Sequence, residues 1–163
     1  MKILDACTYI NSYLEFDYKK YAKLGYDTLL LDIDNTLSPY YEEEPSQEII
    51  DFINDIKNSG FEIIIISNNT KDRVEKYVKK LNCKYYYFSL KPLIFTYLRI
   101  IEENKLEKNK IICLGDQLIT DILGGNSLGL YTIYCKPIVN KDNFSGKITR
   151  SIERIIFKLN GKM

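Results

Sequence analysis

The chain has 163 residues, 45% of them hydrophobic, and its 23 basic and 22 acidic side chains nearly cancel. This length and composition predict one folded domain with a substantial core, and they exclude a disordered chain and a nucleic-acid-binding protein that relies on bulk positive charge. The absence of histidine leaves proton transfer to Asp, Glu, Lys, Tyr or water. The four cysteines are scattered without a CxxC pair, so a zinc site is not expected.

Residues 1–26 are expected to form a helical lead-in. Residues 9–24 alternate aromatic and aliphatic residues with charged ones at roughly helical spacing, and Gly25 suits the end of a helix. An aromatic-rich face of this kind usually covers the core, and contact with a membrane surface is the alternative. The first residues lack the composition of a signal peptide, and no apolar run approaches the roughly 20 residues that span a bilayer. A cytoplasmic protein is therefore expected.

The apolar run Leu29-Leu30-Leu31 predicts the first strand, which spans roughly residues 27–34 and is buried on both faces. It ends in two carboxylates, Asp32 and Asp34. A buried strand brings its polar residues out at an end, and ligands bind an open parallel sheet at the carboxyl ends of its strands. Two carboxylates placed there repel each other and favour a divalent cation, and one of them could attack phosphorus as a nucleophile.

Strands and helices alternate along the rest of the chain. Further strands are expected at 61–66, 83–88, 110–114 and 130–134. Helices are expected from the N-cap Ser46 to Gly60, over 71–81, from Lys91-Pro92 to about 103, and over 148–159. This alternation predicts an α/β fold with a doubly wound, Rossmann-like, parallel sheet of five strands. Residues 27–135 would form the core of a single domain, and residues 136–163 a tail with a last helix.

Four sets of polar residues follow predicted strands or begin a helix. They are Asp32 with Asp34, Ser67 with Asn68, Lys91, and Asp116 with Asp121. In a doubly wound sheet these sets converge in one crevice. Carboxylates suit Mg²⁺, which prefers oxygen ligands, while a hydroxyl, an amide and an ammonium group can hold phosphate oxygens. Each set alone could be a helix cap or a solvated strand end, but together they favour a phosphate site.

In order and spacing, these residues resemble the four motifs of the haloacid dehalogenase (HAD) superfamily. The matching residues are Asp32-Ile33-Asp34-Asn35-Thr36, Ser67-Asn68, Lys91, and Gly115-Asp116 with Asp121. The resemblance extends over residues 28–134. More narrowly, the motifs resemble those of the YqeG-like, type IIIA branch of the superfamily, which is related to the mitochondrial phosphatidylglycerophosphate phosphatase.

The resemblance implies a Mg²⁺-dependent phosphatase of the HAD type. Asp32 would be the nucleophile that forms an aspartyl-phosphate. Asp34 would protonate the leaving oxygen, then activate water, and its backbone carbonyl would bind the metal.

The resemblance also implies roles for the three later motifs. Ser67 and the backbone at Asn68 would hold the transferring phosphoryl group, and Lys91 would offset its charge and that of the nucleophile. Asp116 would bind the metal, and Asp121 would bind it through water or orient Lys91.

The chain leaves no room for the specificity caps that the family places after its first or second strand. About a dozen residues separate Asp34 from the next predicted helix, and residues 67–91 hold one helix and one strand. An open site is therefore expected, which suits a lipid headgroup, a macromolecular end or a lid supplied by a partner. Tyr40 and Tyr41 are candidates for substrate contact, and the acidic run 42–44 is expected to be solvated, without a catalytic role.

Several functions stay open at this stage. The closer resemblance favours phosphatidylglycerophosphate as substrate, with peripheral membrane contact through the amino-terminal segment, and a soluble sugar phosphate or nucleotide is the alternative. A signalling receiver domain normally carries its phosphorylated Asp after a later strand, which disfavours that class here. A non-catalytic binding or assembly protein with the same fold is the third class. The oligomeric state is not predicted.

Overall fold

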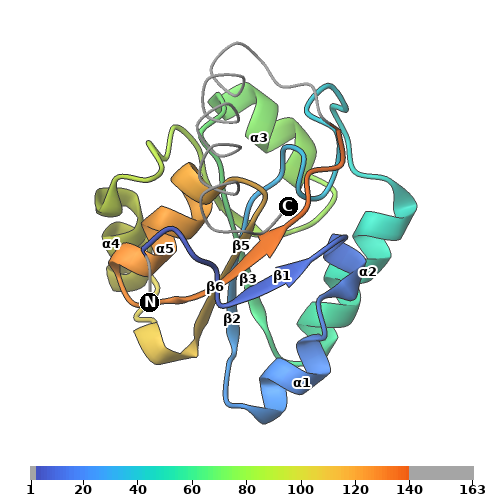
Figure 1. The fold of residues 1–163 in the computed structure, drawn as a ribbon. Coiled ribbons are helices and arrows are strands. Elements are labelled where there is room, and N and C mark those ends of the chain that lie inside the picture. The colour runs from blue at the N-terminus through green and yellow to red at the C-terminus, as the bar shows by residue number, and fades with distance from the viewer. Residues whose placement is uncertain (1–2, 140–163) are drawn as a thin grey trace.

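The computed structural model describes residues 3–139, which form a parallel sheet between two layers of helices (Figure 1). The strands are β1 (Thr8–Ile10), β2 (Thr28–Leu31), β3 (Glu62–Ile66), β4 (Lys84–Tyr86), β5 (Ile111–Gly115) and β6 (Tyr131–Cys135). The α-helices are α1 (Tyr18–Lys23), α2 (Gln47–Asn58), α3 (Lys71–Val78), α4 (Ile94–Glu103) and α5 (Leu123–Ser127). Short 3-10 helices cover Tyr13–Glu15 and Lys108–Lys110, and a π-helical turn covers Leu118–Ile122.

The strand order places a topological switch point at the centre of the sheet. The order is β1-β6-β5-β2-β3-β4, and each neighbouring pair is parallel. The chain runs from β2 outward through β3 to β4 and then returns to β5, on the other side of β2. In a sheet of this kind the crevice outside the carboxyl ends of the two strands at the switch point is where ligands bind. Here those strands are β2 and β5.

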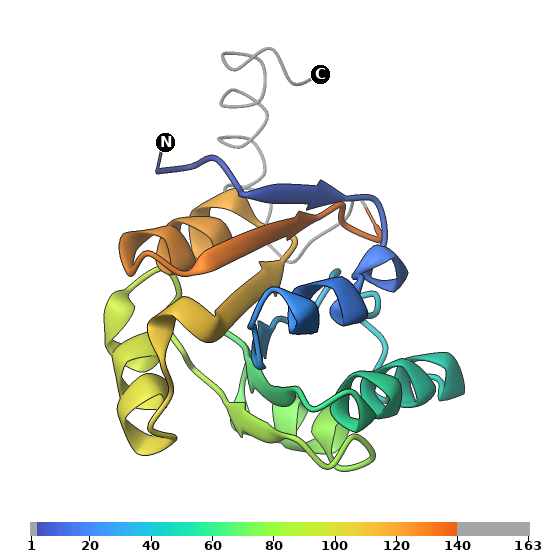
Figure 2. The same ribbon diagram turned by 90° about the horizontal axis from the view of Figure 1, so that it is seen from below.

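The alternate side chains of the central strands pack into two separate cores. Leu29 and Leu31 of β2 belong to the cluster covered by α1, α2 and α3, whereas Leu30 belongs to the cluster covered by α4. Figure 2 shows α1 and α2 on one side of the sheet and α4 and α5 on the other. Both faces of β2 are therefore buried, which explains why three leucines follow one another in it.

The doubly wound α/β fold is confirmed, but within residues 3–139 the sheet has six strands instead of the predicted five. The additional strand is β1, which pairs with β6 at the edge of the sheet. It lies at the start of the predicted helical lead-in, residues 1–26. The predicted lead-in is instead a strand, one 3-10 turn and the six-residue helix α1. Three residues are too few for strand alternation to be recognised in a sequence.

The aromatic residues of this amino-terminal segment cover the core, which is the first of the two roles that the sequence predicts for them. Tyr13, Phe16 and Tyr21 are all less than 10% exposed. Phe16 stacks on Tyr21, with ring centroids 5.4 Å apart, and meets the edge of Phe61 at 6.1 Å. The alternative of a membrane contact through these rings therefore has no support in the structure.

Two predicted helix boundaries need comment. Ser46 caps α2 as predicted, since its hydroxyl accepts a hydrogen bond from the Ile49 N–H at 3.3 Å. The helix expected to begin at Lys91-Pro92 begins instead at Ile94, because Leu90 to Leu93 form a turn closed by the Leu93 N–H and the Leu90 carbonyl at 2.9 Å. The helix predicted for 148–159 lies outside the described residues. From residue 3 to residue 139, no helix combines the length and apolar character needed to cross a membrane.

Candidate active site

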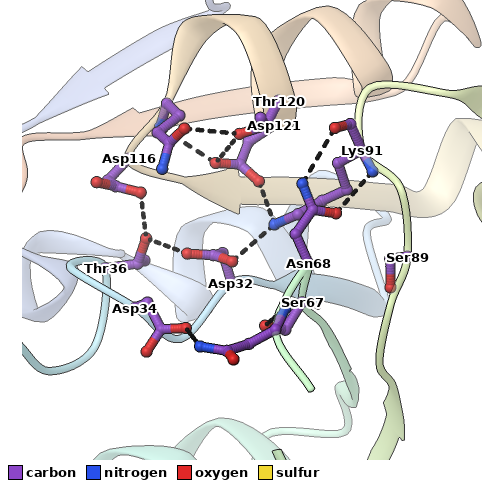
Figure 3. A network of polar contacts seen from close by, with 12 residues as sticks. Asp32, Asp34, Thr36, Ser67, Asn68, Ser89, Lys91, Asp116, Thr120 and Asp121 are labelled. Atoms are coloured by element: carbon purple, nitrogen blue, oxygen red, sulfur yellow. Dashed lines mark hydrogen bonds and ion pairs between the residues drawn. The ribbon is translucent and has the colours of Figure 1, made fainter. Parts of the chain in front are cut away.

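The predicted site residues meet at the carboxyl edge of the sheet. Asp32 follows β2, Ser67 follows β3 and Asp116 follows β5, and these three strands are neighbours. Lys91 arrives from the segment between β4 and α4, and Asp121 from the π-helical turn after β5. Figure 3 shows their side chains converging on one point from these different elements. The side chains predicted from the strand ends are thus brought together at the switch point.

At the centre of the site, the ammonium group of Lys91 lies between two carboxylates. Its Nζ is 2.6 Å from Oδ1 of Asp32 and 2.6 Å from Oδ1 of Asp121. The three side chains are less than 10% exposed. Charge-assisted hydrogen bonds of this length, away from water, fix both carboxylates and the ammonium group in one geometry.

Three carboxylates of the site are close enough to hold a metal ion. One oxygen each from Asp32, Asp116 and Asp121 lies within 4.8 Å of the others, and all three residues are buried. The Thr36 hydroxyl is 3.1 Å from Oδ2 of Asp32 and 3.4 Å from Oδ1 of Asp116, which joins these two acids. With one lysine among them, the three acids leave an excess of buried negative charge. A divalent cation with oxygen ligands would offset this charge.

The titration of Asp32 and Lys91 is shifted by their burial. The pKa of Asp32 is raised to about 7, and burial is the largest cause. The charge of Lys91 opposes this rise, and the nearby Asp121 and Asp34 contribute to it. Burial alone would lower the pKa of Lys91, but the charges of Asp121 and Asp32 outweigh it and raise this pKa above its usual value. Lys91 is therefore an ammonium group, and a bound cation would favour the carboxylate form of Asp32.

Asp121 is oriented by the backbone around it. Its Oδ1 accepts from Lys91, and its Oδ2 accepts from the Gln117 N–H at 3.1 Å. A Cβ at Gly115 would lie 2.3 Å from the Asp121 carboxyl carbon, so only glycine fits at this end of β5. The sequence predicted that Asp121 either binds metal or orients Lys91, and the structure contains the contact with Lys91.

Asp34 points to a different part of the site. Its Oδ1 accepts from Nη2 of Arg73 at 2.9 Å, and its Oδ2 accepts from Nδ2 of Asn69 at 3.1 Å. The guanidinium carbon of Arg73 lies 5.0 Å from the centroid of the Tyr77 ring. The carboxylate of Asp34 is not one of the three that lie close enough together to hold a metal ion, which we call the acidic trio: Asp32, Asp116 and Asp121. Figure 3 shows Asp34 on the Ser67 side of Asp32.

Arg73, Asn69 and Thr36 were missed as site residues in the sequence. Arg73 is one of 23 basic residues and begins no recognisable motif. It could have been singled out only by knowing that the first turn of α3 passes the end of β2. Thr36, by contrast, lies inside the first motif, and Asn69 directly follows Ser67-Asn68, so a polar residue at either position is a detectable signal.

Ser67 and Asn68 link the end of β3 to the lysine segment. The Nδ2 of Asn68 donates to the Lys91 carbonyl at 3.1 Å, and its Oδ1 accepts from the Lys91 N–H at 2.7 Å. The Ser67 carbonyl accepts from the Ser89 N–H at 3.0 Å, and the Ser67 hydroxyl accepts from the Asn69 N–H at 3.1 Å. The side chain of Asn68 thus holds Lys91 in place.

Comparison with known proteins shows which family the chain resembles. The family model described as haloacid dehalogenase-like hydrolase matches residues 8–135. The probable phosphatase YqeG of Bacillus subtilis is 32% identical over 128 residues, which cover 78% of this chain and 74% of the relative. The mannosyl-3-phosphoglycerate phosphatase of Pyrococcus furiosus is 41% identical over a shorter stretch of 56 residues, 34% of this chain and 22% of that enzyme.

Solved structures with this fold are more distant in sequence. An uncharacterized protein from Listeria monocytogenes superposes with a TM-score of 0.58 at 14% identity, over 71% of this chain and 85% of that one. A protein described as a HAD-type hydrolase bound to magnesium, YfnB of Bacillus subtilis, gives 0.51 at 18% identity, over 61% and 48%. At these identities the likeness concerns the fold alone.

The raised pKa of Asp32 predicts how stability depends on pH. The ordinary pKa of an aspartate is 3.8, and the pKa of folded Asp32 is about 7. Between these two pH values, Asp32 has released its proton in the unfolded chain but still binds it in the folded protein. The stability that Asp32 contributes is therefore lost over this range, and Asp32→Asn removes the loss. In the presence of a chelator, the difference in Tm between Asp32→Asn and wild type should become more positive from pH 5 to pH 8. Asp55→Asn, an exposed position on α2, controls for the loss of one carboxylate, and an unchanged difference would contradict the expectation.

Proposed function

The chain belongs to the haloacid dehalogenase-like hydrolase family and is a phosphatase, and we propose that it hydrolyses phosphomonoesters through an aspartyl-phosphate formed on Asp32. The observation that carries this proposal is the position of Lys91, whose Nζ lies 2.6 Å from both Asp32 and Asp121. A buried carboxylate beside a fixed ammonium group is suited to attack a phosphoryl group and to stabilise the charge that develops on it.

The reaction proceeds in two displacements at phosphorus. A carboxylate oxygen of Asp32 forms a bond to phosphorus, the bond from phosphorus to the ester oxygen breaks, and Asp34 gives a proton to the leaving alkoxide. Asp34 then takes a proton from water as this water attacks phosphorus. The acyl-phosphate bond breaks, which releases inorganic phosphate and restores Asp32 as a carboxylate.

The remaining polar groups would hold the phosphoryl oxygens and the reacting side chains. The Ser67 hydroxyl and the backbone at Asn68 would bind the phosphoryl group, together with Lys91. Arg73 and Asn69 hold both oxygens of Asp34, so we assign them the task of positioning this acid and base. Groups that orient a proton-transferring side chain act on rate more than on binding.

The acidic trio fits a magnesium ion. Asp32, Asp116 and Asp121 would provide oxygen ligands, and the backbone carbonyl of Asp34 would be a further one. Only oxygen donors are present among these side chains, which is the set that a hard cation prefers. When bound, the ion neutralises charge on the phosphoryl oxygens and favours the ionised form of Asp32.

The substrate we propose is phosphatidylglycerophosphate, and a soluble sugar phosphate or nucleotide is the alternative. Within residues 3–139, no cap domain interrupts the core, since Ser67 and Lys91 are separated by α3 and β4 alone. The site therefore accepts a phosphate carried by a large or membrane-bound molecule. We also propose that the whole chain acts as one domain, with residues 27–135 as its catalytic core.

The first test is phosphate release with Mg²⁺ from a panel of phosphatidylglycerophosphate, sugar phosphates and nucleotides. Asp32→Asn removes the nucleophile and should lower the rate at least about a thousandfold, whereas Asp55→Asn should leave it unchanged. The preferred substrate in the panel decides between the lipid and the soluble alternatives. If purified wild type hydrolyses none of them, the non-catalytic binding protein is the better interpretation.

The metal site makes an independent prediction that does not require a substrate. A ligand that binds only the folded chain raises its Tm. Mg²⁺ should therefore raise the Tm of chelator-treated wild type, and Asp116→Asn should reduce this increase strongly. Differential scanning fluorimetry with and without Mg²⁺ measures both, with Asp55→Asn as the matched control. An equal Mg²⁺-dependent increase in Asp116→Asn would place the ion elsewhere.

The positioning role of Arg73 can be separated from a general need for positive charge. Arg73→Met removes the contact with Asp34 and should lower kcat by roughly 10–100-fold with a smaller effect on KM. Lys76→Met removes an exposed positive charge from the same helix, where it pairs with Glu43, and should leave both constants unchanged. The pH profile of kcat should shift in Arg73→Met alone, because only that variant changes the partner of Asp34. An unchanged profile would mean that Arg73 has a structural role only.

A further inference from the structure

An unusual number of large apolar side chains is exposed next to the active site. Among residues 3–139, six of the twelve exposed large hydrophobic residues fall between positions 87 and 98. We call them the apolar rim: Tyr87, Phe88, Leu90, Leu93, Phe95 and Leu98. Phe95 is 73% exposed, Leu90 64% and Phe88 57%. Soluble monomers rarely gather so much apolar surface in one place unless it binds something.

The rim and the active site share one segment of chain, in which residues alternate between the two. Ser89 and Lys91 are buried toward the site, at 1% and 6% exposure, while Phe88 and Leu90 project outward. Phe88 and Leu90 have φ values of +43° and +53°, a left-handed conformation that is uncommon for bulky residues. Such conformations persist where the surrounding structure holds them and are concentrated at functional sites. The conformation that delivers Lys91 to Asp32 therefore also exposes apolar side chains at the same edge of the sheet.

The members of the rim follow one another closely along the chain, next to a residue of the site. The Tyr87 and Phe88 rings are in contact, with centroids 5.9 Å apart, and the turn at Leu90 to Leu93 continues directly into α4, which carries Phe95. The Phe88 N–H donates to the carbonyl of Asn69, the residue that holds Asp34. Figure 1 shows this yellow-green segment at the periphery of the molecule, leading into α4.

Charge is almost absent from this segment. Residues 85–98 contain a single charged side chain, Lys91, and its ammonium group is buried in the site. The basic residues that flank the segment, Lys84 and Arg99, are each paired with an acid, Glu62 and Glu103. Within residues 85–98, the rim therefore has no exposed charge for electrostatic docking.

We propose that the apolar rim inserts into the headgroup and acyl-chain boundary of a lipid bilayer. Aromatic and aliphatic side chains without charge suit this boundary, where no directional partner is needed. An amphiphilic phosphomonoester carries its phosphate and its acyl chains in one molecule, and this chain exposes apolar side chains beside its phosphate site. The inference rests on the proposed function, since it names the surface through which that site meets a lipid substrate.

The first experiment measures binding to sedimenting vesicles of phosphatidylcholine and phosphatidylglycerol. Wild type should sediment with the vesicles, and high salt should weaken this little, because insertion depends on apolar area. The double variant Leu93→Ser/Phe95→Ser should bind at least about tenfold more weakly. The matched control Leu14→Ser/Leu24→Ser removes two exposed leucines on the amino-terminal segment and should bind like wild type.

A second measurement does not depend on loss of binding. The chain contains no tryptophan, so Phe95→Trp introduces a single reporter at the rim, and Leu24→Trp introduces one far from it in sequence. Addition of vesicles should shift the emission of Phe95→Trp to shorter wavelength and leave that of Leu24→Trp unchanged. Equal behaviour of the two reporters would overturn the proposal.

The outcomes separate this proposal from the proposed function. If wild type releases phosphate from a soluble phosphomonoester but does not sediment with vesicles, the lipid surface is wrong and the phosphatase stands. If wild type sediments but hydrolyses neither lipid nor soluble esters, the proposed activity fails instead. A dimer in analytical ultracentrifugation that Leu93→Ser/Phe95→Ser dissociates would overturn the lipid proposal and make the rim an interface between two copies.

Discussion

The buried ammonium group of Lys91 is the constraint on which the rest of the site depends. An unpaired charge in this position would cost several kcal/mol, and the two carboxylates at 2.6 Å offset that cost. The surrounding structure is arranged to keep the three groups together. Asn68 binds the backbone of Lys91 on both sides, and the absence of a side chain at Gly115 makes room for Asp121. The same network leaves an excess of negative charge, which is the condition for binding a divalent cation.

The order of the strands determines which side chains can take part in this network. Because β2 lies between β5 and β3, Asp32 is a neighbour of both Ser67, which is 35 positions away in the sequence, and Asp116, which is 84 positions away. The loop after β2 forms further ion pairs, Glu43 with Lys76 of α3 and Glu44 with Lys80, two residues beyond the end of α3. The acidic run expected to be only solvated thus lies along a basic helix, and Arg73 on that helix extends the same series of contacts inward to Asp34.

The segment between β4 and α4 joins the chemistry to the surface. It was expected to be the start of a helix, because proline is well tolerated there. Instead it is a turn in which buried polar residues alternate with exposed apolar ones. This alternation has the period of a strand, yet the backbone at Phe88 and Leu90 is left-handed. A pattern argument therefore assigned the wrong local structure to the segment that brings Lys91 into the site.

The sequence alone was sufficient for the α/β fold, the central strands and the motif residues. Strands buried on both faces require uninterrupted apolar runs, and the carboxylates that end them must emerge at the edge of the sheet. Only the tertiary structure decided that β1 is a sixth strand, that Arg73 and Asn69 hold Asp34, and that residues 87–98 expose an apolar surface. These features are contacts between residues distant in the chain, or the solvent exposure that such contacts leave behind. Neither is encoded in the spacing of residues along one element, because both follow from how separate elements are placed against each other.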